Sequence, residues 1–271
     1  MDTSSTNSIV PDISAYRDFQ DFLAKKTVKK DHTDKKVITN TRIGDKTKSI
    51  FGGSYNIQDA EYPTFLKLYY RDVIRKKGKE YLTEKQRDSD GPIAIDLDFR
   101  YSYNVDEKQH TSELIDDIVS EYLNVIKTIY QFDESSKFYA FVLEKPSVNR
   151  VSDKNITKDG IHIIFKIQME RNLQLYVRKQ MMKIAKDLFE NLPLTNSMDE
   201  IFDEGITRGS VNWQLFGSRK PGYDKYGLTR IFEITYDPAD EELCMNEKNV
   251  SSFDIEKNLT KLSIRDNKGS L

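Results

Sequence analysis

The sequence predicts an α+β fold in which a ferredoxin-like sheet is covered on one side by helices. Three apolar segments have the character of strands, at residues 91–103, 138–143 and 161–167. Two long amphipathic segments have helical periodicity, at residues 112–130 and 172–191. Their order along the chain is strand, helix, strand, strand, helix, which resembles half of a ferredoxin-like sheet with its helices on one side.

The segments before this region predict two helices. Residues 12–24 carry a short apolar stripe at helical spacing, with Asp12 or Ser14 as candidate caps. Residues 59–77 carry a wider stripe and end in a basic turn before Gly78, which is a good helix stop.

Two polar segments flank the first of these helices. Residues 1 to about 12 are rich in Ser, Thr and Asn, which predicts a mobile start. Residues 25–48 are rich in lysine and predict an exposed loop or hairpin. The alternative is a contact with the phosphates of a nucleic acid, because clustered lysines attract phosphates without reading a base sequence.

The end of the chain is predicted to alternate strands with polar segments. A polar loop is expected at residues 148–159, and strands are expected at 210–218 and 229–236. After Pro238 the sequence is polar and charged, with one weak helix around 255–262, and it predicts no further core. We therefore expect the chain to be part of a longer protein.

The composition excludes several classes of protein. One cysteine, Cys244, excludes a disulfide framework and a zinc site built on several thiolates. No apolar run approaches the ~18 residues of a membrane span, and the start lacks a secretion signal, so a soluble intracellular protein is expected. The net charge is −2, so any basic surface that binds nucleic acid must be local.

The segment around which the chain is organised is GPIAIDLDFRYSY, residues 91–103. On a strand, side chains alternate between two faces, so Asp96 and Asp98 point one way while Ile95 and Leu97 point the other. Two carboxylates so close repel each other unless a cation lies between them. Because the donors are all oxygens, Mg²⁺ or Mn²⁺ is the expected cation. The alternative is an acidic pair in solvent at the end of a strand.

A second candidate site follows at residues 158–162. His162 comes two residues after Gly160, which lets a ligand approach the backbone, and Lys158 lies just upstream. A ring nitrogen of His162 could donate to a triphosphate oxygen. Two alternatives remain, a structural histidine within a strand and a histidine that ligates a metal.

A third carboxylate is a candidate to join the first two. Asp203 follows an apolar pair, and beside Asp96 and Asp98 it would complete a two-metal site, because each ion needs several oxygen ligands. The alternative is an acidic helix cap. The role of Glu204, the next residue, is open.

A basic turn completes the set of candidate residues. Ser218, Arg219 and Lys220 lie between two glycines, where side-chain and backbone donors converge well on a phosphate. A basic turn in solvent is the alternative.

Together these motifs resemble the primase part of the archaeo-eukaryotic primase superfamily, and more closely the N-terminal half of the primase-helicases of nucleocytoplasmic large DNA viruses. The resemblance covers about residues 60–236 and includes YLTEKQ, KDGIHIIF and DEGITRGSVNWQLFGSRKPG. The superfamily pattern is an acidic pair after an apolar strand, a small residue two before a histidine, and an apolar residue before an acid. The matching residues are Asp96 and Asp98, Gly160 and His162, and Phe202 and Asp203. One departure is Gly160, where many members carry serine.

The resemblance implies the archaeo-eukaryotic primase fold, with an RRM-like antiparallel sheet covered by helices and a small N-terminal α/β module. We expect an N-terminal extension with a basic loop at 1–55, a catalytic domain at 56–240, and a polar tail or linker at 241–271. The implied activity is that of a DNA primase or primase-polymerase, a nucleotidyltransferase that makes short primers on single-stranded DNA. A metal-dependent nuclease and a non-catalytic module that binds single-stranded DNA remain alternatives.

The resemblance also implies roles and partners. Catalysis and the binding of two Mg²⁺ or Mn²⁺ ions fall to Asp96, Asp98 and Asp203. Nucleotide binding falls to His162, Gly160, Lys158, Ser218, Arg219 and Lys220. The expected partners are a single-stranded DNA template, nucleoside triphosphates and a helicase domain in the same or a partner chain, because this chain contains no GxxxxGK[ST] phosphate loop. No membrane is expected, and the expected location is the host cytoplasm, in a viral factory, or the nucleus.

Overall fold

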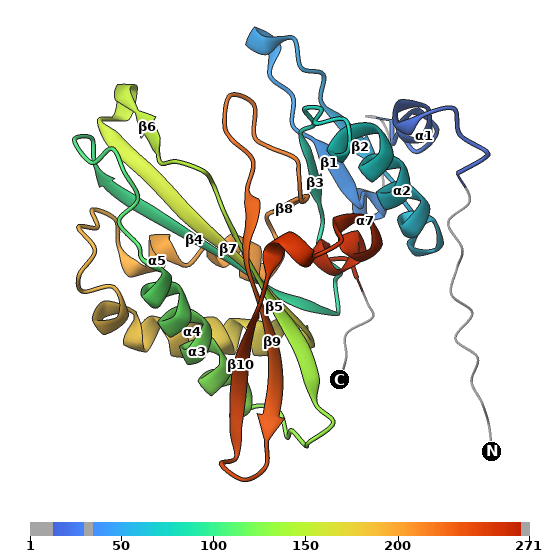
Figure 1. The fold of residues 1–271 in the computed structure, drawn as a ribbon. Helices are drawn as coiled ribbons and strands as arrows, with labels where there is room; N and C mark the ends of the chain where they lie inside the picture. The colour runs from blue at the N-terminus through green and yellow to red at the C-terminus, as the bar shows by residue number, and fades with distance from the viewer. Residues whose placement is uncertain (1–12, 30–34, 267–271) are drawn as a thin grey trace, which may run out of the picture.

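Two antiparallel sheets organise the chain in the computed structural model, which describes residues 13–29 and 35–266 (Figure 1). The larger sheet has the order β10-β9-β5-β7-β4 with β6 paired to β7, and the smaller has the order β2-β1-β3-β8. The strands are β1 (Asn40–Arg42), β2 (Gly53–Tyr55), β3 (Leu82–Glu84), β4 (Asp90–Ser102), β5 (Lys137–Glu144), β6 (Asn149–Val151), β7 (Ile156–Glu170), β8 (Trp213–Gln214), β9 (Gly227–Asp237) and β10 (Glu242–Lys248). The α+β class is confirmed. The prediction for residues 1 to about 12 lies outside the described residues.

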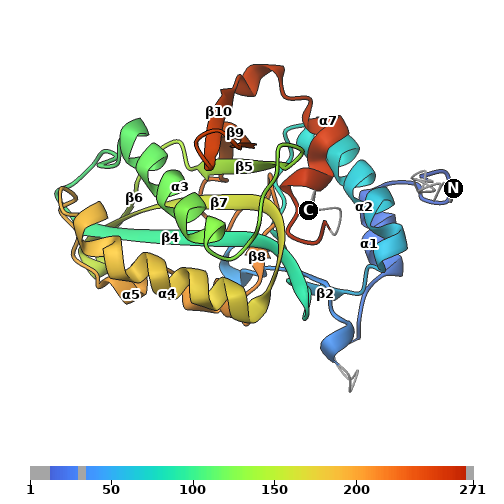
Figure 2. The ribbon, with the colours of Figure 1, turned by 90° about the horizontal axis from the view of Figure 1, so that it is seen from below.

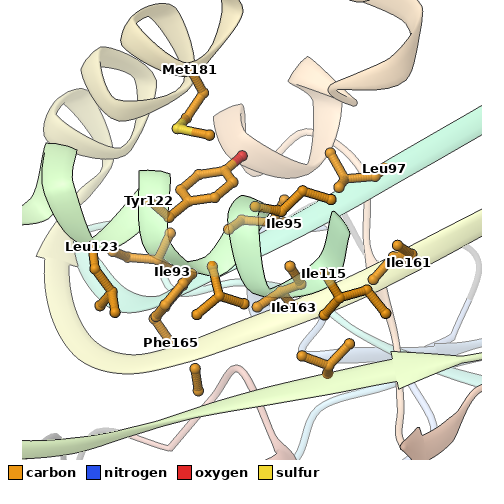
Figure 3. Packing of buried hydrophobic residues seen from close by; sticks show 14 of the residues in the cluster. Ile93, Ile95, Leu97, Ile115, Tyr122, Leu123, Ile161, Ile163, Phe165 and Met181 are labelled. Atoms are coloured by element: carbon orange, nitrogen blue, oxygen red, sulfur yellow. The ribbon is translucent and has the colours of Figure 1, made fainter. Parts of the chain in front are cut away.

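The helices are α1 (Phe19–Lys25), α2 (Tyr62–Tyr69), α3 (Ser112–Lys127), α4 (Arg171–Leu188), α5 (Met198–Ile201), α6 (Glu204–Arg208) and α7 (Ile255–Asn258). Helices α3 and α4 cover one face of the large sheet (Figure 2). Alternate residues of β4 and β7, such as Leu97 and Ile163, pack against Tyr122 of α3 and Met181 of α4 (Figure 3). The opposite face of β4 and β7 is therefore free of these helices.

The predicted order of strand, helix, strand, strand, helix is present as β4, α3, β5, β7 and α4. Strand β7 lies between β4 and β5 and is antiparallel to both. The split arrangement follows because a helix connects β4 to β5 and leaves room for a third strand between them. Strand β9 then pairs with β5, on the side away from β4.

The first predicted helix is shorter than expected. It begins at Phe19 rather than near residue 12, because Asp18 is the N-cap and its side chain accepts a hydrogen bond from the Asp21 nitrogen. Ser14 does not have this role, and the other candidate, Asp12, lies outside the described residues. The second predicted helix, residues 59–77, is α2 followed by a π-helical turn, and it ends where the Gly78 nitrogen donates to the Val73 carbonyl.

Two strand predictions need correction. The predicted loop at 148–159 holds β6 and the first residues of β7, because Thr157 to Asp159 pair with the end of β4 although they are polar. The predicted strand at 210–218 is a strand only at Trp213 and Gln214, and these pair with β3 in the small sheet.

The segment after Pro238 carries a core that the sequence did not predict. Strand β10 pairs with β9, and α7 lies beside α2 in both ribbon views (Figures 1 and 2). Leu259, Leu262 and Ile264 are buried. The carboxylate of Glu84 is buried as well, and it accepts hydrogen bonds from the Tyr62 hydroxyl, the Ser263 hydroxyl and the Ile264 nitrogen. If this segment were not packed against the rest of the protein, the buried carboxylate of Glu84 would lose the hydrogen bonds from Ser263 and Ile264. These residues are therefore part of the fold.

The small sheet joins strands from both sides of residue 55, where the N-terminal extension was expected to end. Strands β1 and β2 come from residues up to 55, and β3 and β8 come from after it. Within the part of the chain that the structure describes, no helix is both long and apolar enough to cross a bilayer.

The docking of the last segment gives a stability prediction. Leu262→Ala removes a buried side chain that is 1% exposed and leaves a cavity. The free energy of unfolding should fall by about 2–5 kcal/mol, measured by urea denaturation. A change below about 0.5 kcal/mol would show that this segment contributes nothing to the core.

Candidate active site

Strands β4 and β7 place two carboxylates opposite a histidine and a glycine. Asp96 pairs with His162, and Asp98 pairs with Gly160, in one unbroken antiparallel register from Ile93 to Ser102. Because side chains alternate, all four residues belong to the sheet face that α3 and α4 leave uncovered. Lys158 shares this face, two residues before Gly160.

Asp203 joins the acid pair through the main chain. A β-bridge links Leu97 with Phe202, and the nitrogen of Asp203 donates to the carbonyl oxygen of Asp96 at 3.1 Å. One carboxylate oxygen from each of Asp96, Asp98 and Asp203 lies within 4.8 Å of the others. Asp203 is also a helix cap, which was the alternative for this residue. Its side chain accepts hydrogen bonds from the nitrogens of Gly205 and Ile206 at the start of α6.

The electrostatics of the acid pair show the cost of placing two carboxylates together. Burial and then the neighbouring Asp96 raise the pKa of Asp98. Burial would also raise the pKa of Asp96, but His162, followed by Lys220 and Lys145, lowers it overall. Asp96 is therefore the carboxylate that stays ionised more readily. The pKa of Asp98 is the one that is raised by burial and by the repulsion within the pair.

The three aspartates fit a hard divalent cation. All of their ligand atoms are oxygens, the donor type that Mg²⁺ and Mn²⁺ prefer. Oδ1 of Asp96 is buried and lacks a hydrogen-bond partner, so it keeps its capacity to act as a ligand. A bound cation would also remove the repulsion that raises the pKa of Asp98.

His162 is held between two aromatic rings. Its ring stacks on Tyr226, with centroids 3.6 Å apart and planes 16° apart, and its centroid lies 4.3 Å from that of Trp213. Nε2 lies 3.3 Å from Oδ1 of Asp96. The imidazole is thus fixed beside the carboxylates by its packing between the two rings.

Glycine is required at residue 160. A Cβ atom there would lie 2.8 Å from the carbonyl oxygen of Leu97 and 3.1 Å from the hydroxyl of Tyr226. The first contact is with the backbone of the paired strand, which cannot give way without moving β4. The side chain that many members of the superfamily carry at this place has no room here, and the Tyr226 hydroxyl lies beside the glycine instead.

The three residues of the basic turn, Ser218, Arg219 and Lys220, lie in different surroundings. Lys220 is exposed, and its charge lowers the pKa of both Asp96 and Asp98, so it lies on the side of the carboxylates. Arg219 lines a pocket next to them. Ser218 is fully buried, and its hydroxyl is bonded to the Tyr69 hydroxyl and the Leu82 nitrogen. The structure therefore places Ser218 in the packing and not in the carboxylate site.

Two residues of the site were missed from the sequence. Tyr226 stacks on His162, and Nζ of Lys145 lies 4.9 Å from the centre of the Tyr226 ring. Lys145 directly follows β5, and β5 pairs with β7. The available signal was the position of Lys145 at the end of a buried strand, but using it needs the strand order.

A buried ionic cluster lies behind Gly160. Nε2 of His110 is 2.7 Å from Glu144, and its Nδ1 is 3.2 Å from Asp159. Oδ1 of Asp159 accepts a hydrogen bond from the Gly160 nitrogen. Burial alone would lower the pKa of His110, but its contacts with Asp159 and Glu144 raise it to about 9. Burial would raise the pKa of Glu144, but hydrogen bonds from His110, Lys108 and Thr229 lower it to about 2.

Comparison with known proteins covers the part of the chain that holds this site. A family model described as the C962R protein N-terminal AEP domain matches residues 46–232, a range that contains every candidate residue named above. A protein of Acanthamoeba polyphaga mimivirus, named "Putative helicase L207/L206", is 34% identical over 171 residues. That match covers 62% of this chain and 17% of the mimivirus protein, so this chain spans less than a fifth of its relative.

Because of the close approach at Gly160, we expect alanine to destabilise the protein more at this position than at Gly91 on the paired strand. Gly160→Ala should lower the free energy of unfolding by about 1–3 kcal/mol, because β4 and β7 must separate. Gly91→Ala is the matched control, since a Cβ there meets only the Ile264 carbonyl oxygen at 3.6 Å. Urea denaturation measures both. Equal stability of the two variants would contradict the close approach.

The histidine cluster predicts a dependence of stability on pH. Because folding raises the pKa of His110 from 6.5 to about 9, its contribution is complete below pH 6.5 and is lost as the pH rises through about 9. His110→Gln should therefore destabilise the protein at about pH 6, on the order of 2 kcal/mol, and much less at about pH 10. Chemical denaturation at both pH values tests this. A cost independent of pH would mean that the imidazole is not charged.

Proposed function

This chain belongs to the family of C962R N-terminal AEP domains, the primase domains of viral primase-helicases, and we propose that it synthesises short primers on single-stranded DNA. The observation that carries the proposal is the meeting of Asp96, Asp98 and Asp203 beside His162, inside the matched region. We assign the large sheet to the RRM-like sheet of this superfamily, which the arrangement of β4, β5 and β7 under α3 and α4 supports.

The proposed role of the three aspartates is to hold Mg²⁺ or Mn²⁺. When bound, two such ions would activate the 3′-hydroxyl of the primer and neutralise the leaving pyrophosphate. The protein contributes the spacing of the ligands. Asp96 and Asp98 are fixed by the strand register, and Asp203 is fixed by its cap on α6 and its bond to the Asp96 carbonyl.

The proposed role of His162 is to donate a hydrogen bond to a phosphate oxygen of the incoming nucleoside triphosphate. Its ring is oriented before the nucleotide arrives, because Tyr226 and Trp213 pack against it. Lys220 and Lys158 lie near enough to affect the pKa of Asp98, so they can place positive charge near the same phosphates. Gly160 allows the Leu97 carbonyl and the Tyr226 hydroxyl to approach the strand, so its proposed contribution is to the packing beside His162.

We also propose that this domain acts with a helicase domain during viral DNA replication. The name of the mimivirus relative supports this, and most of that protein lies beyond the matched segment. The helicase would lie in the same chain or in a partner chain.

Neutralising the carboxylates one at a time tests the proposal. Asp98→Asn and Asp203→Asn keep the size of the side chain, and asparagine can still cap α6. Both should lower primer synthesis by on the order of a hundredfold or more. Glu204→Gln is the matched control, because Glu204 pairs with Arg208 of its own helix and is not one of the three converging acids. The assay is extension on single-stranded DNA with Mg²⁺ or Mn²⁺, with ribo- and deoxyribonucleotides compared.

A second measurement separates metal binding from activity. Mn²⁺ should raise the melting temperature of the wild type and of Glu204→Gln, but not that of Asp98→Asn. Without metal, Asp98→Asn should melt higher than the wild type, since the carboxylate it replaces is destabilised by burial and by Asp96. Full primer synthesis by Asp98→Asn would refute the assignment. Shortening of the DNA without triphosphates would identify a nuclease instead.

A further inference from the structure

A basic pocket of about 280 Å³ lies next to the candidate active site. Its lining includes three cations, two tyrosines and one acid, which are Lys79, Lys145, Arg219, Tyr81, Tyr223 and Asp224. Lys145 connects the pocket to the site, because its ammonium lies over the ring of Tyr226, which stacks on His162. The chain as a whole has a net charge of −2, so this concentration of positive charge is local.

The cations of the pocket are not held in salt bridges within the described chain. Among the described residues, none forms a salt bridge with Lys79, Lys145 or Arg219. Nε of Arg219 is buried and has no hydrogen-bond partner. Burial and then the nearby Lys220 lower the pKa of Lys145. Positive groups that are crowded together and partly desolvated predict an anionic ligand, which would supply the missing partners.

A loop that contacts the edge of the pocket carries an exposed aromatic side chain, Phe51. Phe51 is 84% exposed, which is unusual for a phenylalanine, and its loop also carries Lys48. The loop contacts the basic turn, because a Cβ placed at Gly222 would lie 3.2 Å from Cε of Lys48. Tyr223, on the same turn, is 40% exposed. Cations and exposed rings therefore occur both on the turn that lines the pocket and on the loop that contacts it.

We propose that the pocket and Phe51 together bind a segment of single-stranded DNA that leads to the three aspartates. The phosphates would lie among Lys79, Lys145 and Arg219, and a base would stack on Phe51. A single strand carries phosphates and bases in regular succession, which matches cations and rings that extend over several elements. A lone nucleotide has one base and would need only one of these rings. The inference rests on the proposed function and deepens it by giving the template a path.

The contribution of Phe51 is tested by direct binding. Phe51→Ala should weaken the binding of a fluorescently labelled oligothymidylate about tenfold, measured by anisotropy without metal or nucleotide. Tyr176→Ala is the matched control, because Tyr176 is an aromatic residue that is 45% exposed on α4, the helix that covers the other face of the sheet. Circular dichroism confirms that each variant is folded, which is expected for exposed positions. Equal loss in both variants would overturn the proposal.

The phosphate contacts are tested by the dependence on salt. Lys79→Ala should weaken binding of the oligonucleotide and reduce the slope of log K against log salt concentration by about one. Lys183→Ala on α4 is the control and should leave the slope unchanged. An unchanged slope in Lys79→Ala would overturn the proposal.

Two further outcomes separate this inference from the proposed function. If Phe51→Ala and Lys79→Ala weaken the binding of ATP, followed by thermal shift, but not of the oligonucleotide, the pocket belongs to the nucleotide and the inference is wrong. If both variants lose DNA binding as expected while the wild type makes no primers, the proposed DNA-binding surface is supported. The proposed primer synthesis is then wrong. These binding measurements need no catalysis, so their outcome does not depend on primer synthesis.

Discussion

The pairing of β4 with β7 is the constraint on which the candidate site depends. A shift of one residue would turn Asp96 and Asp98 toward α3 and α4 and bring Leu97 out of the core. The register is held on one face by apolar packing. On the other face it is held by the close approach of Gly160 to the Leu97 carbonyl, which no other residue permits. The same register supplies His162 as the neighbour of Asp96, so the position of the imidazole is a consequence of sheet geometry.

The protein positions its acids without neutralising them. Asp203 reaches the pair through a main-chain bond and a helix cap, and these contacts fix the carboxylate while adding no cation. Lys145 and Lys220 act on Asp96 and Asp98 from a distance, since neither forms a salt bridge with them within the described chain. A lysine or arginine placed between the carboxylates would remove their repulsion but would also occupy the space between them. Leaving that space to a metal ion is what the proposed activity requires.

Sequence reasoning succeeded where a single segment carries the signal. The alternation around Asp96 and Asp98 and the helical periods of α3 and α4 are local, and all of them appear in the structure. Properties that depend on strand order could not be predicted from the sequence. Lys145 and Tyr226 join the site only because β5 lies beside β7 and β9 beside β5. The polar start of β7 and the core around Leu262 were missed because their partners are distant in sequence. The approach of Asp203 came from the family pattern and from the need for a third oxygen ligand, not from a local signal.

The cluster of His110, Glu144 and Asp159 shows how a buried ionic group can serve the site without touching it. Buried ion pairs contribute little net stability, because desolvation offsets their attraction. Their geometry is nevertheless specific. Asp159 holds the nitrogen of Gly160, and Glu144 on β5 accepts from Thr229 on β9, so one imidazolium ties three strands together. It does so at the point where Gly160 offers no side chain for packing. The charged cluster therefore contributes to the position of the backbone at Gly160 from the core face of the sheet, where Phe99 packs beside His110.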